Sequence, residues 1–207
     1  MLSFTGFRFV EADGTYRYEG YTPPEGHLSL TKLMERNVIH TSTVVVRREV
    51  LLAIGGFDES LNTCEDFDLW LKIAATSPTA IRAIPERLAD YRRHEGQVTK
   101  SWEGMHAGWC AVADRLAREH PKDWARVDRR AWGYQLEYCA SLAYNAGDTK
   151  GARRLMLKAW RKSGLGLLAD KNAVTMTGVA VVSAFPRPIQ IAIGSVAQAA
   201  RRWSSKP

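Results

Sequence analysis

The sequence predicts an α+β domain, with a mixed sheet, followed by an all-helical region. Two alternating segments flank a turn signal near the N-terminus, short strand-like runs recur among helical patterns up to residue 92, and beyond Trp102 the patterns are helical throughout. The length of 207 residues suits one large or two small domains. We therefore predict a domain over 1–102 and a helical extension over 103–207.

The N-terminal segment is predicted to form a β-hairpin. Residues 4–10 and 15–18 alternate between apolar and polar side chains, and Asp13-Gly14 between them is a strong turn signal. Apolar residues at helical spacing then predict a helix over 28–36, and the β-branched run over 42–46 predicts a short buried strand. The order is hairpin, helix, strand.

The middle of the chain is predicted to continue this mixed pattern. A short helix begins at Arg48 and ends at Gly55-Gly56, because Gly55 can adopt the positive φ that commonly follows a helix C-terminus. A longer amphipathic helix is predicted over 65–77, and two strands are predicted over 79–84 and 88–92.

Five helices are predicted in the second half, interrupted by prolines. They lie near 104–118, 123–146, 149–163, 171–185 and 189–203. The segment 144–148, Tyr-Asn-Ala-Gly-Asp, predicts a turn between two of them and resembles one tetratricopeptide hairpin. One copy cannot form a solenoid, which needs at least about three repeats.

Charge is distributed unevenly along the chain. Residues 1–102 hold 12 Lys and Arg against 14 Asp and Glu, whereas residues 103–207 hold 17 against 8. Anionic lipid or nucleic acid can attract a basic half, although solvated helix faces are the commoner explanation. Because no nucleic-acid-binding motif accompanies the charge, nucleic acid is not an expected partner.

The cysteines and the apolar segments indicate the compartment. Cys64, Cys110 and Cys139 have neither zinc-site spacing nor the density of a disulfide scaffold, which predicts a reducing cytoplasm. The apolar stretch 173–200 is interrupted by Pro186-Arg187-Pro188 into halves shorter than the ~20 residues of a spanning helix. We therefore expect no spanning helix there, and peripheral contact of residues 165–203 with the inner face of the membrane.

Adjacent carboxylates, Glu65 and Asp66, mark the start of the helix over 65–77. Backbone amides and the dipole at a helix N-terminus keep a carboxylate ionised and able to accept a proton, so Asp66 is a candidate catalytic base. The alternative is structural, since Thr63 followed three residues later by Asp66 matches a capping box. The residues alone leave both interpretations open.

Asp66-Phe67-Asp68 also has the spacing of an Asp-x-Asp metal motif. We reject a metal site here, because residues two apart on a helix point to nearly opposite sides.

A basic cluster follows the last predicted strand. Arg92 and Arg93 can bind phosphate oxygens, and His94 can bind a metal ion through a neutral imidazole nitrogen. Alternation along a strand would send Arg92 and His94 to one face and Arg93 to the other. A solvated loop after an edge strand is the alternative.

His40, which precedes a predicted strand, is either a satisfied core residue or an acceptor contact.

Four ordered motifs together resemble glycosyltransferase family 2. They are Ser42-Thr43-Val44-Val45-Val46-Arg47-Arg48, Gly55-Gly56-Phe57-Asp58-Glu59-Ser60-Leu61, Glu65-Asp66-Phe67-Asp68-Leu69-Trp70-Leu71-Lys72 and Tyr91-Arg92-Arg93-His94-Glu95-Gly96. The resemblance covers roughly residues 1–100 and is to the C-terminal half of that family's GT-A catalytic domain.

This resemblance implies an inverting transfer of a sugar from a nucleotide-sugar donor to an acceptor hydroxyl. In the family the Glu-Asp pair supplies the base, which matches Asp66 with Glu65 beside it. The glycine loop that lies near donor and acceptor matches Gly55 and Gly56.

The resemblance also implies a divalent metal, Mn²⁺ or Mg²⁺, bound with the help of the histidine that matches His94. Arg92 and Arg93 would then neutralise the leaving diphosphate. The product class that it implies is cell-surface polysaccharide or glycolipid.

The family's N-terminal half, with its nucleotide-binding units and Asp-x-Asp motif, has no counterpart in these 207 residues. We therefore expect a truncated transferase with weak or no activity alone, an exposed sheet edge, and a partner that is either the missing half or a second copy. The alternative function is a non-catalytic interaction or membrane-surface scaffold. A third interpretation is a small α+β protein whose helical hairpin binds proteins.

Overall fold

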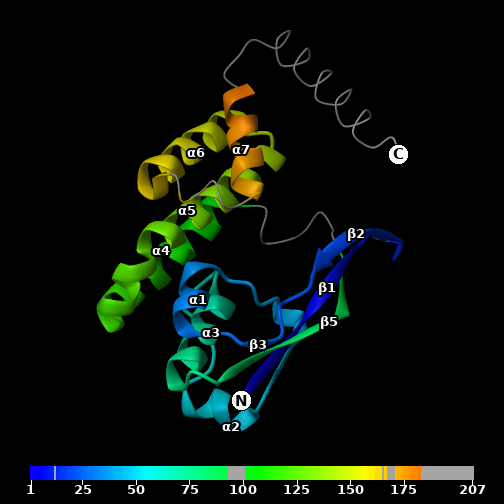
Figure 1. Cartoon of the computed structure of the whole chain (residues 1–207), viewed down its shortest axis with the longest axis vertical. Helices are drawn as coiled ribbons and strands as arrows, with labels where there is room; N and C mark the ends of the chain where they lie inside the picture. The colour runs from blue at the N-terminus through cyan, green and yellow to red at the C-terminus, as the bar shows by residue number, and fades with distance from the viewer. Residues whose placement is uncertain (12, 93–100, 165, 167–170, 183–207) are drawn as a thin grey trace. The chain divides into compact units, whose positions relative to one another are not determined.

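The computed structural model describes residues 1–11, 13–92, 101–164, 166 and 171–182 (Figure 1). Arg93, His94, the predicted helix over 189–203 and most of the predicted membrane-contact segment lie outside these residues. The chain forms a mixed sheet with helices, followed by a helical region, which confirms the predicted α+β class. Two compact units are present, Met1–Ala131 and Trp132–Pro207.

A mixed sheet forms the centre of the first unit. Strands β1 (Leu2–Val10) and β2 (Tyr16–Tyr21) make the predicted antiparallel hairpin, and β1 also pairs in parallel with β5 (Ile81–Arg92). The short β3 (Gly26–His27) pairs with β5 antiparallel, so the order is β2-β1-β5-β3. No described strand pairs with β5 on that side beyond Ala83. The sheet edge expected from a missing half stays a prediction.

One long strand replaces the two predicted over 79–84 and 88–92. Strand β5 continues through Pro85, and its register with β1 shifts where Phe4 pairs with Ala83 and Gly6 pairs with Arg87. Proline cannot donate a ladder hydrogen bond, which made a strand break the expected outcome. This shift in register accommodates Pro85, so the strand continues past it.

The strand predicted over 42–46 is shorter and more exposed than expected. It begins as the 3₁₀ helix η1 (Thr41–Thr43) and continues as β4 (Val44–Val46). Strand β4 pairs with Leu2–Phe4 of β1, and Val45 is 73% exposed. The prediction of a buried strand was wrong, because β-branched residues also suit an edge strand with one solvated face.

Helices α1 (Leu30–Glu35) and α3 (Glu65–Thr76) lie side by side in Figure 1 and carry much of the apolar core. Leu33 of α1 and Leu69 and Ile73 of α3 are fully buried, as is Ile81 of β5. The apolar side predicted for α3 from Phe67, Trp70, Leu71 and Ala74 is buried as well, so α3 buries more of its surface than the prediction gave it.

A glycine turn ends helix α2 (Arg48–Ala53), as predicted. Gly55 and Gly56 have φ of 81° and 70°, values that favour glycine. The turn redirects the chain toward the start of α3.

Helix α4 (Trp102–Glu119) packs against the loop that precedes α3. A Cβ atom on Gly108 would lie 2.2 Å from Thr63 Oγ1, so only glycine allows this approach. Thr63 Oγ1 donates to the carbonyl oxygen of Gly104 at 2.8 Å. Helix α4 therefore supports the segment that leads to Asp66.

Helix α5 (Pro121–Asn145) begins in the first unit and continues into the second, later than the predicted boundary near Trp102. The division into a family-like domain over 1–102 and an extension over 103–207 stays a prediction.

The second unit contains the end of α5, then α6 (Thr149–Ser163) and α7 (Lys171–Val182). The predicted turn is present, with Gly147 at φ 86° and Asp148 Oδ1 accepting from the Gly151 amide at 2.8 Å. Trp160 Nε1 of α6 donates to Thr177 Oγ1 of α7 at 2.8 Å. Across the described part of the chain, no helix has both the length and the apolarity that crossing a bilayer requires.

Candidate active site

Asp66 lies in the first turn of α3 and is half-buried. Its Oδ1 accepts a hydrogen bond from the Phe67 amide at 2.6 Å, and its Oδ2 accepts one from Thr41 Oγ1 at 2.6 Å. Each oxygen keeps a lone pair for a further donor. The neighbouring Glu65 is exposed. Asp66 is therefore held in place while still able to accept a proton.

The structure does not form the capping box. The N-cap of α3 is Cys64, which makes no side-chain capping bond and has the left-handed φ of 64°. Thr63, the expected capping residue, bonds to Gly104 in α4 instead. The carboxylate of Asp66 is therefore not part of a reciprocal cap.

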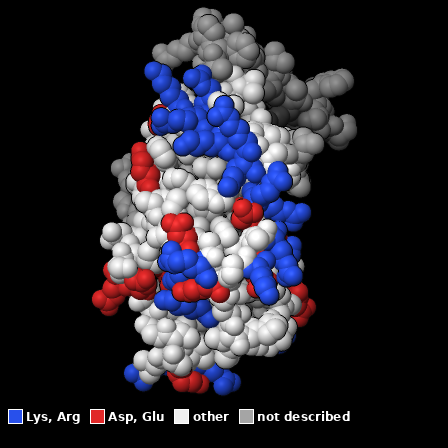
Figure 2. All heavy atoms as spheres, turned by 90° about the vertical axis from the view of Figure 1, so that its left-hand side faces the viewer, with Lys and Arg blue, Asp and Glu red and all other residues white. Residues whose placement is uncertain are grey.

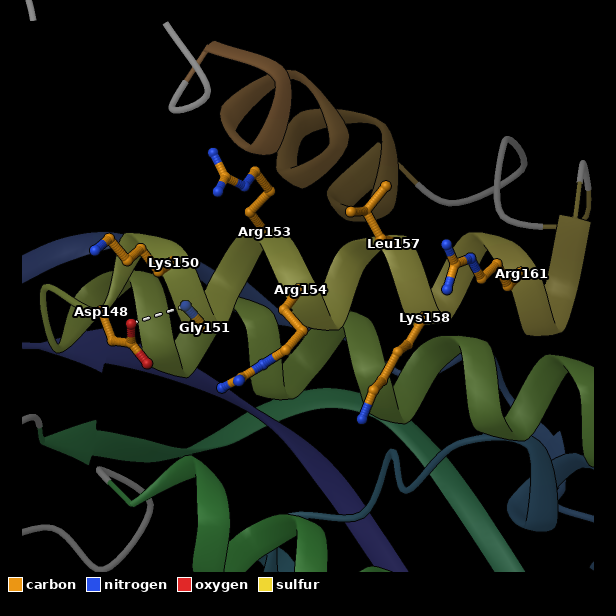
Figure 3. Close-up of a pocket in the computed structure, with 8 residues that line it drawn as sticks. All are labelled: Asp148, Lys150, Gly151, Arg153, Arg154, Leu157, Lys158 and Arg161. Atoms are coloured by element: carbon orange, nitrogen blue, oxygen red, sulfur yellow. Dashed lines mark hydrogen bonds between the residues drawn. The ribbon is translucent and has the colours of Figure 1, made fainter. Parts of the chain in front are cut away.

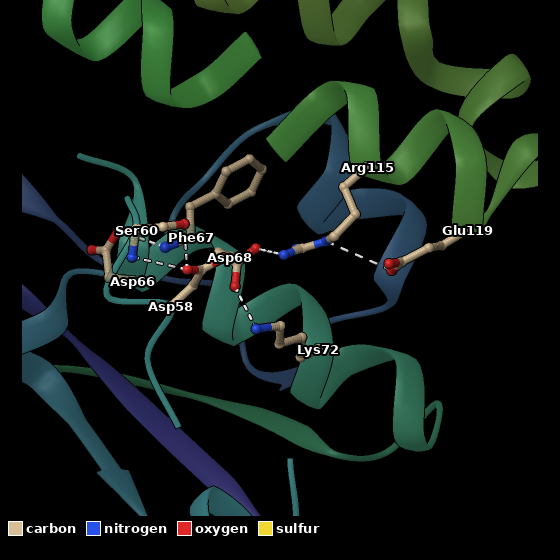
Figure 4. Close-up of polar contacts among 8 residues, drawn as sticks. All are labelled: Asp58, Ser60, Asp66, Phe67, Asp68, Lys72, Arg115 and Glu119. Atoms are coloured by element: carbon tan, nitrogen blue, oxygen red, sulfur yellow. Dashed lines mark hydrogen bonds and ion pairs between the residues drawn. The ribbon is translucent and has the colours of Figure 1, made fainter. Parts of the chain in front are cut away.

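Asp66 and Asp68 belong to different environments, as the rejection of the Asp-x-Asp motif predicted. Asp68 is fully buried and forms ion pairs with Arg115 of α4 and, at 2.9 Å, with Lys72 (Figure 4). Arg115 also lies 3.6 Å from Glu119. Asp68 thus joins α3 to α4, and of these two carboxylates Asp66 is the one that forms no ion pair with a described residue.

The loop after Gly55-Gly56 is built from local contacts. Asp58 Oδ1 accepts from the Ser60 hydroxyl at 2.6 Å and from the Ser60 amide at 3.0 Å, and these bonds lower the pKa of Asp58. The Phe57 ring packs edge-on against Trp70 of α3, with centroids 6.5 Å apart. This loop is thereby tied to the helix that carries Asp66.

His40 lies among aromatic rings, next in sequence to the residue that binds Asp66. Its ring centroid is 4.9 Å from Phe7 and 4.6 Å from Tyr91. Its buried Nδ1 has no hydrogen-bond partner in the described part of the chain. A satisfied core histidine would have such a partner, so the acceptor-contact interpretation of His40 is the one that this observation favours.

Burial lowers the pKa of His40, and the negative charge of Asp66 opposes that shift. A neutral imidazole in this position offers one donor and one acceptor nitrogen to a polar molecule.

Arg92 ends β5, where it is exposed. Its Nη1 donates to the carbonyl oxygen of Glu11, beyond the end of β1, at 3.3 Å. The preceding residue, Tyr91, packs against His40. Arg93 and His94 lie outside the described residues, so the basic cluster stays a prediction.

The described residues do not assemble a metal site. No group of three or more histidine, cysteine, aspartate or glutamate side chains among them is placed to bind one ion. Asp66 and Asp68 hold different partners, as shown above. The divalent metal that the family resemblance implies therefore does not fit the described residues alone, and no step is assigned to it.

A comparison of the sequence with models of protein families identifies the family of this chain. The model described as glycosyltransferase like family 2 matches residues 29–132, half of the chain. The chain belongs to this family. The match includes Thr41, the glycine loop, Asp66 and the Arg115 that binds Asp68. A search of curated proteins found no match.

Two residues of the candidate site in this family 2 chain were assigned no role from the sequence. Thr41 contacts Asp66 from 25 residues away, and Tyr91 of β5 contacts His40, which precedes η1. A threonine before a β-branched run and a tyrosine in a strand are ordinary residues at such positions. Their roles depend on chain segments that meet only in the fold.

Proposed function

We propose that this family 2 chain supplies the catalytic base of an inverting glycosyltransferase. The observation that carries the proposal is the carboxylate of Asp66, which is half-exposed, is anchored by Thr41 and the Phe67 amide, and forms no ion pair among the described residues. The nearby Asp68 is fully buried and ion-paired, so it does not compete for this role.

In the proposed step, an acceptor hydroxyl donates its proton to a carboxylate oxygen of Asp66. The hydroxyl oxygen forms a bond to the anomeric carbon of the nucleotide sugar, and the bond from that carbon to the diphosphate oxygen breaks with inversion. The nucleoside diphosphate leaves with the electron pair. His40, neutral because of its burial, is proposed to contact the acceptor.

The donor side of the reaction rests on the family resemblance. Gly55 and Gly56 are proposed to lie near donor and acceptor, Arg92 and Arg93 to neutralise the diphosphate, and His94 to help bind Mn²⁺ or Mg²⁺. The acceptor is proposed to belong to a cell-surface polysaccharide or glycolipid. The proposed location is cytoplasmic, at the inner face of the membrane.

The test is titration calorimetry of the chain with UDP, GDP and dTDP in Mn²⁺, followed by release of nucleoside diphosphate from the matching nucleotide sugars. Asp66→Asn is expected to keep nucleotide binding and to lower turnover by about 10²–10⁴-fold, the usual contribution of a general base. Asp114→Asn, at an exposed aspartate of α4, is the matched control and should change neither.

Each outcome has a meaning. Unchanged turnover in Asp66→Asn contradicts its role as the base. Weaker nucleotide binding in His94→Ala supports the proposed donor site. A chain that binds none of the three nucleotides is explained either by a donor site that also requires the family's nucleotide-binding units or by the scaffold alternative.

A further inference from the structure

Helix α6 carries a basic face that the transferase proposal does not use. We define this basic face as Lys150, Arg153, Arg154, Lys158 and Arg161. With Leu157, these residues line an open hollow of about 550 Å³ (Figure 3). Helical spacing arranges them in two neighbouring rows, Lys150-Arg154-Lys158 and Arg153-Leu157-Arg161.

The opposite face of α6 explains why the basic face is directed outward. Ala152, Leu155, Met156 and Ala159 are almost completely buried. The cations therefore occupy the solvent side of a strongly amphipathic helix. Figure 2, which shows the face seen from the left-hand side of Figure 1, has Lys and Arg side chains gathered at the level of α6.

The basic face has no acidic counterpart in the described part of the chain. None of its five cations forms an ion pair there, whereas Arg8, Arg115 and Arg126 of the first unit each pair with an aspartate. The one acid at the hollow, Asp148, accepts a hydrogen bond from the Gly151 amide. Residues 149–207 contain 11 Lys and Arg and a single Asp.

Exposed apolar side chains accompany these charges. Leu157, in the middle of one row, is 54% exposed. Helix α7, which packs against α6, exposes Val174 by 47% and Val181 by 56%, and these two residues are two turns apart on one side of the helix. Apolar side chains next to cations suit a surface that offers both phosphate groups and acyl chains.

We propose that the basic face of α6 docks on the surface of a bilayer that contains anionic lipids, with Leu157 contacting the acyl boundary. A nucleic acid would satisfy the five cations but would offer nothing to Leu157. The inference is independent of the proposed transfer, and it assigns the contact to residues outside the 165–203 segment predicted from sequence.

The experiment is flotation of the whole chain with phosphatidylcholine vesicles, with and without phosphatidylglycerol, at low and high salt. Binding is expected only to the anionic vesicles, and it should weaken as salt screens the charges. In the variant Arg154→Gln/Lys158→Gln, partitioning should weaken about 25-fold, since each cation near an anionic surface contributes about fivefold. Leu157→Ala should weaken it about threefold at either salt concentration.

The matched control is Arg118→Gln/Lys122→Gln, which removes the same charge from exposed positions of α4 and α5. It should bind as the unaltered chain does. Circular dichroism melts identify any variant that fails to fold.

Undiminished binding by Arg154→Gln/Lys158→Gln, or tighter binding to a DNA duplex than to anionic vesicles at the same salt, would overturn the proposal. No nucleotide or sugar is needed, so this result is separable from the outcome of the transferase assay.

Discussion

Asp66 illustrates how a single carboxylate is oriented by two different kinds of contact. The bond from the Phe67 amide comes from the first turn of its own helix, where unpaired N–H groups favour negative charge. The bond from the Thr41 hydroxyl comes from η1, in another part of the fold. The first depends on the helix alone, and the second fixes the direction in which the carboxylate points.

Replacing Thr41 tests this orientation. Thr41→Val keeps the side-chain shape and removes the donor, so turnover should fall about tenfold, the effect of losing about one hydrogen bond to a charged group. Thr41→Ser, which keeps the hydroxyl, is the control and should retain most activity. Because Thr41 is exposed, the free energy of unfolding should change by less than about 0.5 kcal/mol in urea titrations. Equal turnover in the Val and Ser variants would contradict the positioning role.

Cys64 shows local strain beside this site. A non-glycine residue at φ 64° costs roughly 1–3 kcal/mol, and it persists where the surroundings enforce it. The enforcing contacts here come from α4, through Thr63 with Gly104 and through the Cys64 thiol, whose Sγ is 3.8 Å from the Met105 carbonyl oxygen. The strain therefore belongs to the packing that sets where α3 begins.

At the scale of elements, α3 and α4 are joined by a buried charge. Asp68 is fully buried, and Arg115 is 17% exposed on its side chain, so their ion pair lies largely out of water. Such pairs contribute little net free energy compared with apolar residues, but removing one partner leaves an uncompensated charge. The pair therefore makes the contact between α3 and α4 specific.

Arg115→Met should lower the free energy of unfolding by about 3 kcal/mol, because Asp68 would remain buried with only Lys72 as its partner. The double variant Asp68→Leu/Arg115→Met should recover most of this loss. Arg126→Met, which breaks the exposed pair with Asp123, is the matched control and should cost less than about 1 kcal/mol. Urea denaturation measures all three, and a double variant less stable than Arg115→Met would refute the explanation.

At the scale of the whole molecule, three free thiols are protected to different degrees. Cys64 and Cys139 are buried, and Cys110 is half-buried. Burial, assisted by the charges of Asp66 and Glu65, raises the pKa of Cys64 to about 12, and burial also raises the pKa of Cys110. In the folded protein Cys64 therefore stays protonated at neutral pH.

Alkylation with iodoacetamide at neutral pH should modify Cys110 first and leave Cys64 and Cys139 intact until urea unfolds the chain. The thiolate fraction of Cys64 should be about a thousandfold below that of an unfolded cysteine, since thiolate is the reactive form. Because the folded pKa is raised, this group's stabilising contribution is complete below pH 9 and is lost as pH rises toward 12. Peptide mass spectrometry measures the order in which the cysteines are alkylated. Early modification of Cys64 would contradict this prediction.

Local patterns in the sequence were sufficient for much of the fold. The hairpin turn at Asp13-Gly14, the glycine stop after α2 and the amphipathic face of α3 follow from backbone sterics and side-chain periodicity within a few residues. The same local information predicted that Asp66 and Asp68 point apart. Each of these features is confirmed in the structure.

Contacts between distant segments determined the features of the fold and of the candidate site that local patterns did not predict. Whether Pro85 interrupts a strand depended on β1, which pairs with β5 on both sides of it. The choice between a capping residue and a candidate base at Asp66 depended on Thr63 bonding to α4 and on Thr41 reaching Asp66. No pattern within one segment encodes such contacts, because their energies depend on which surfaces the folded chain brings together.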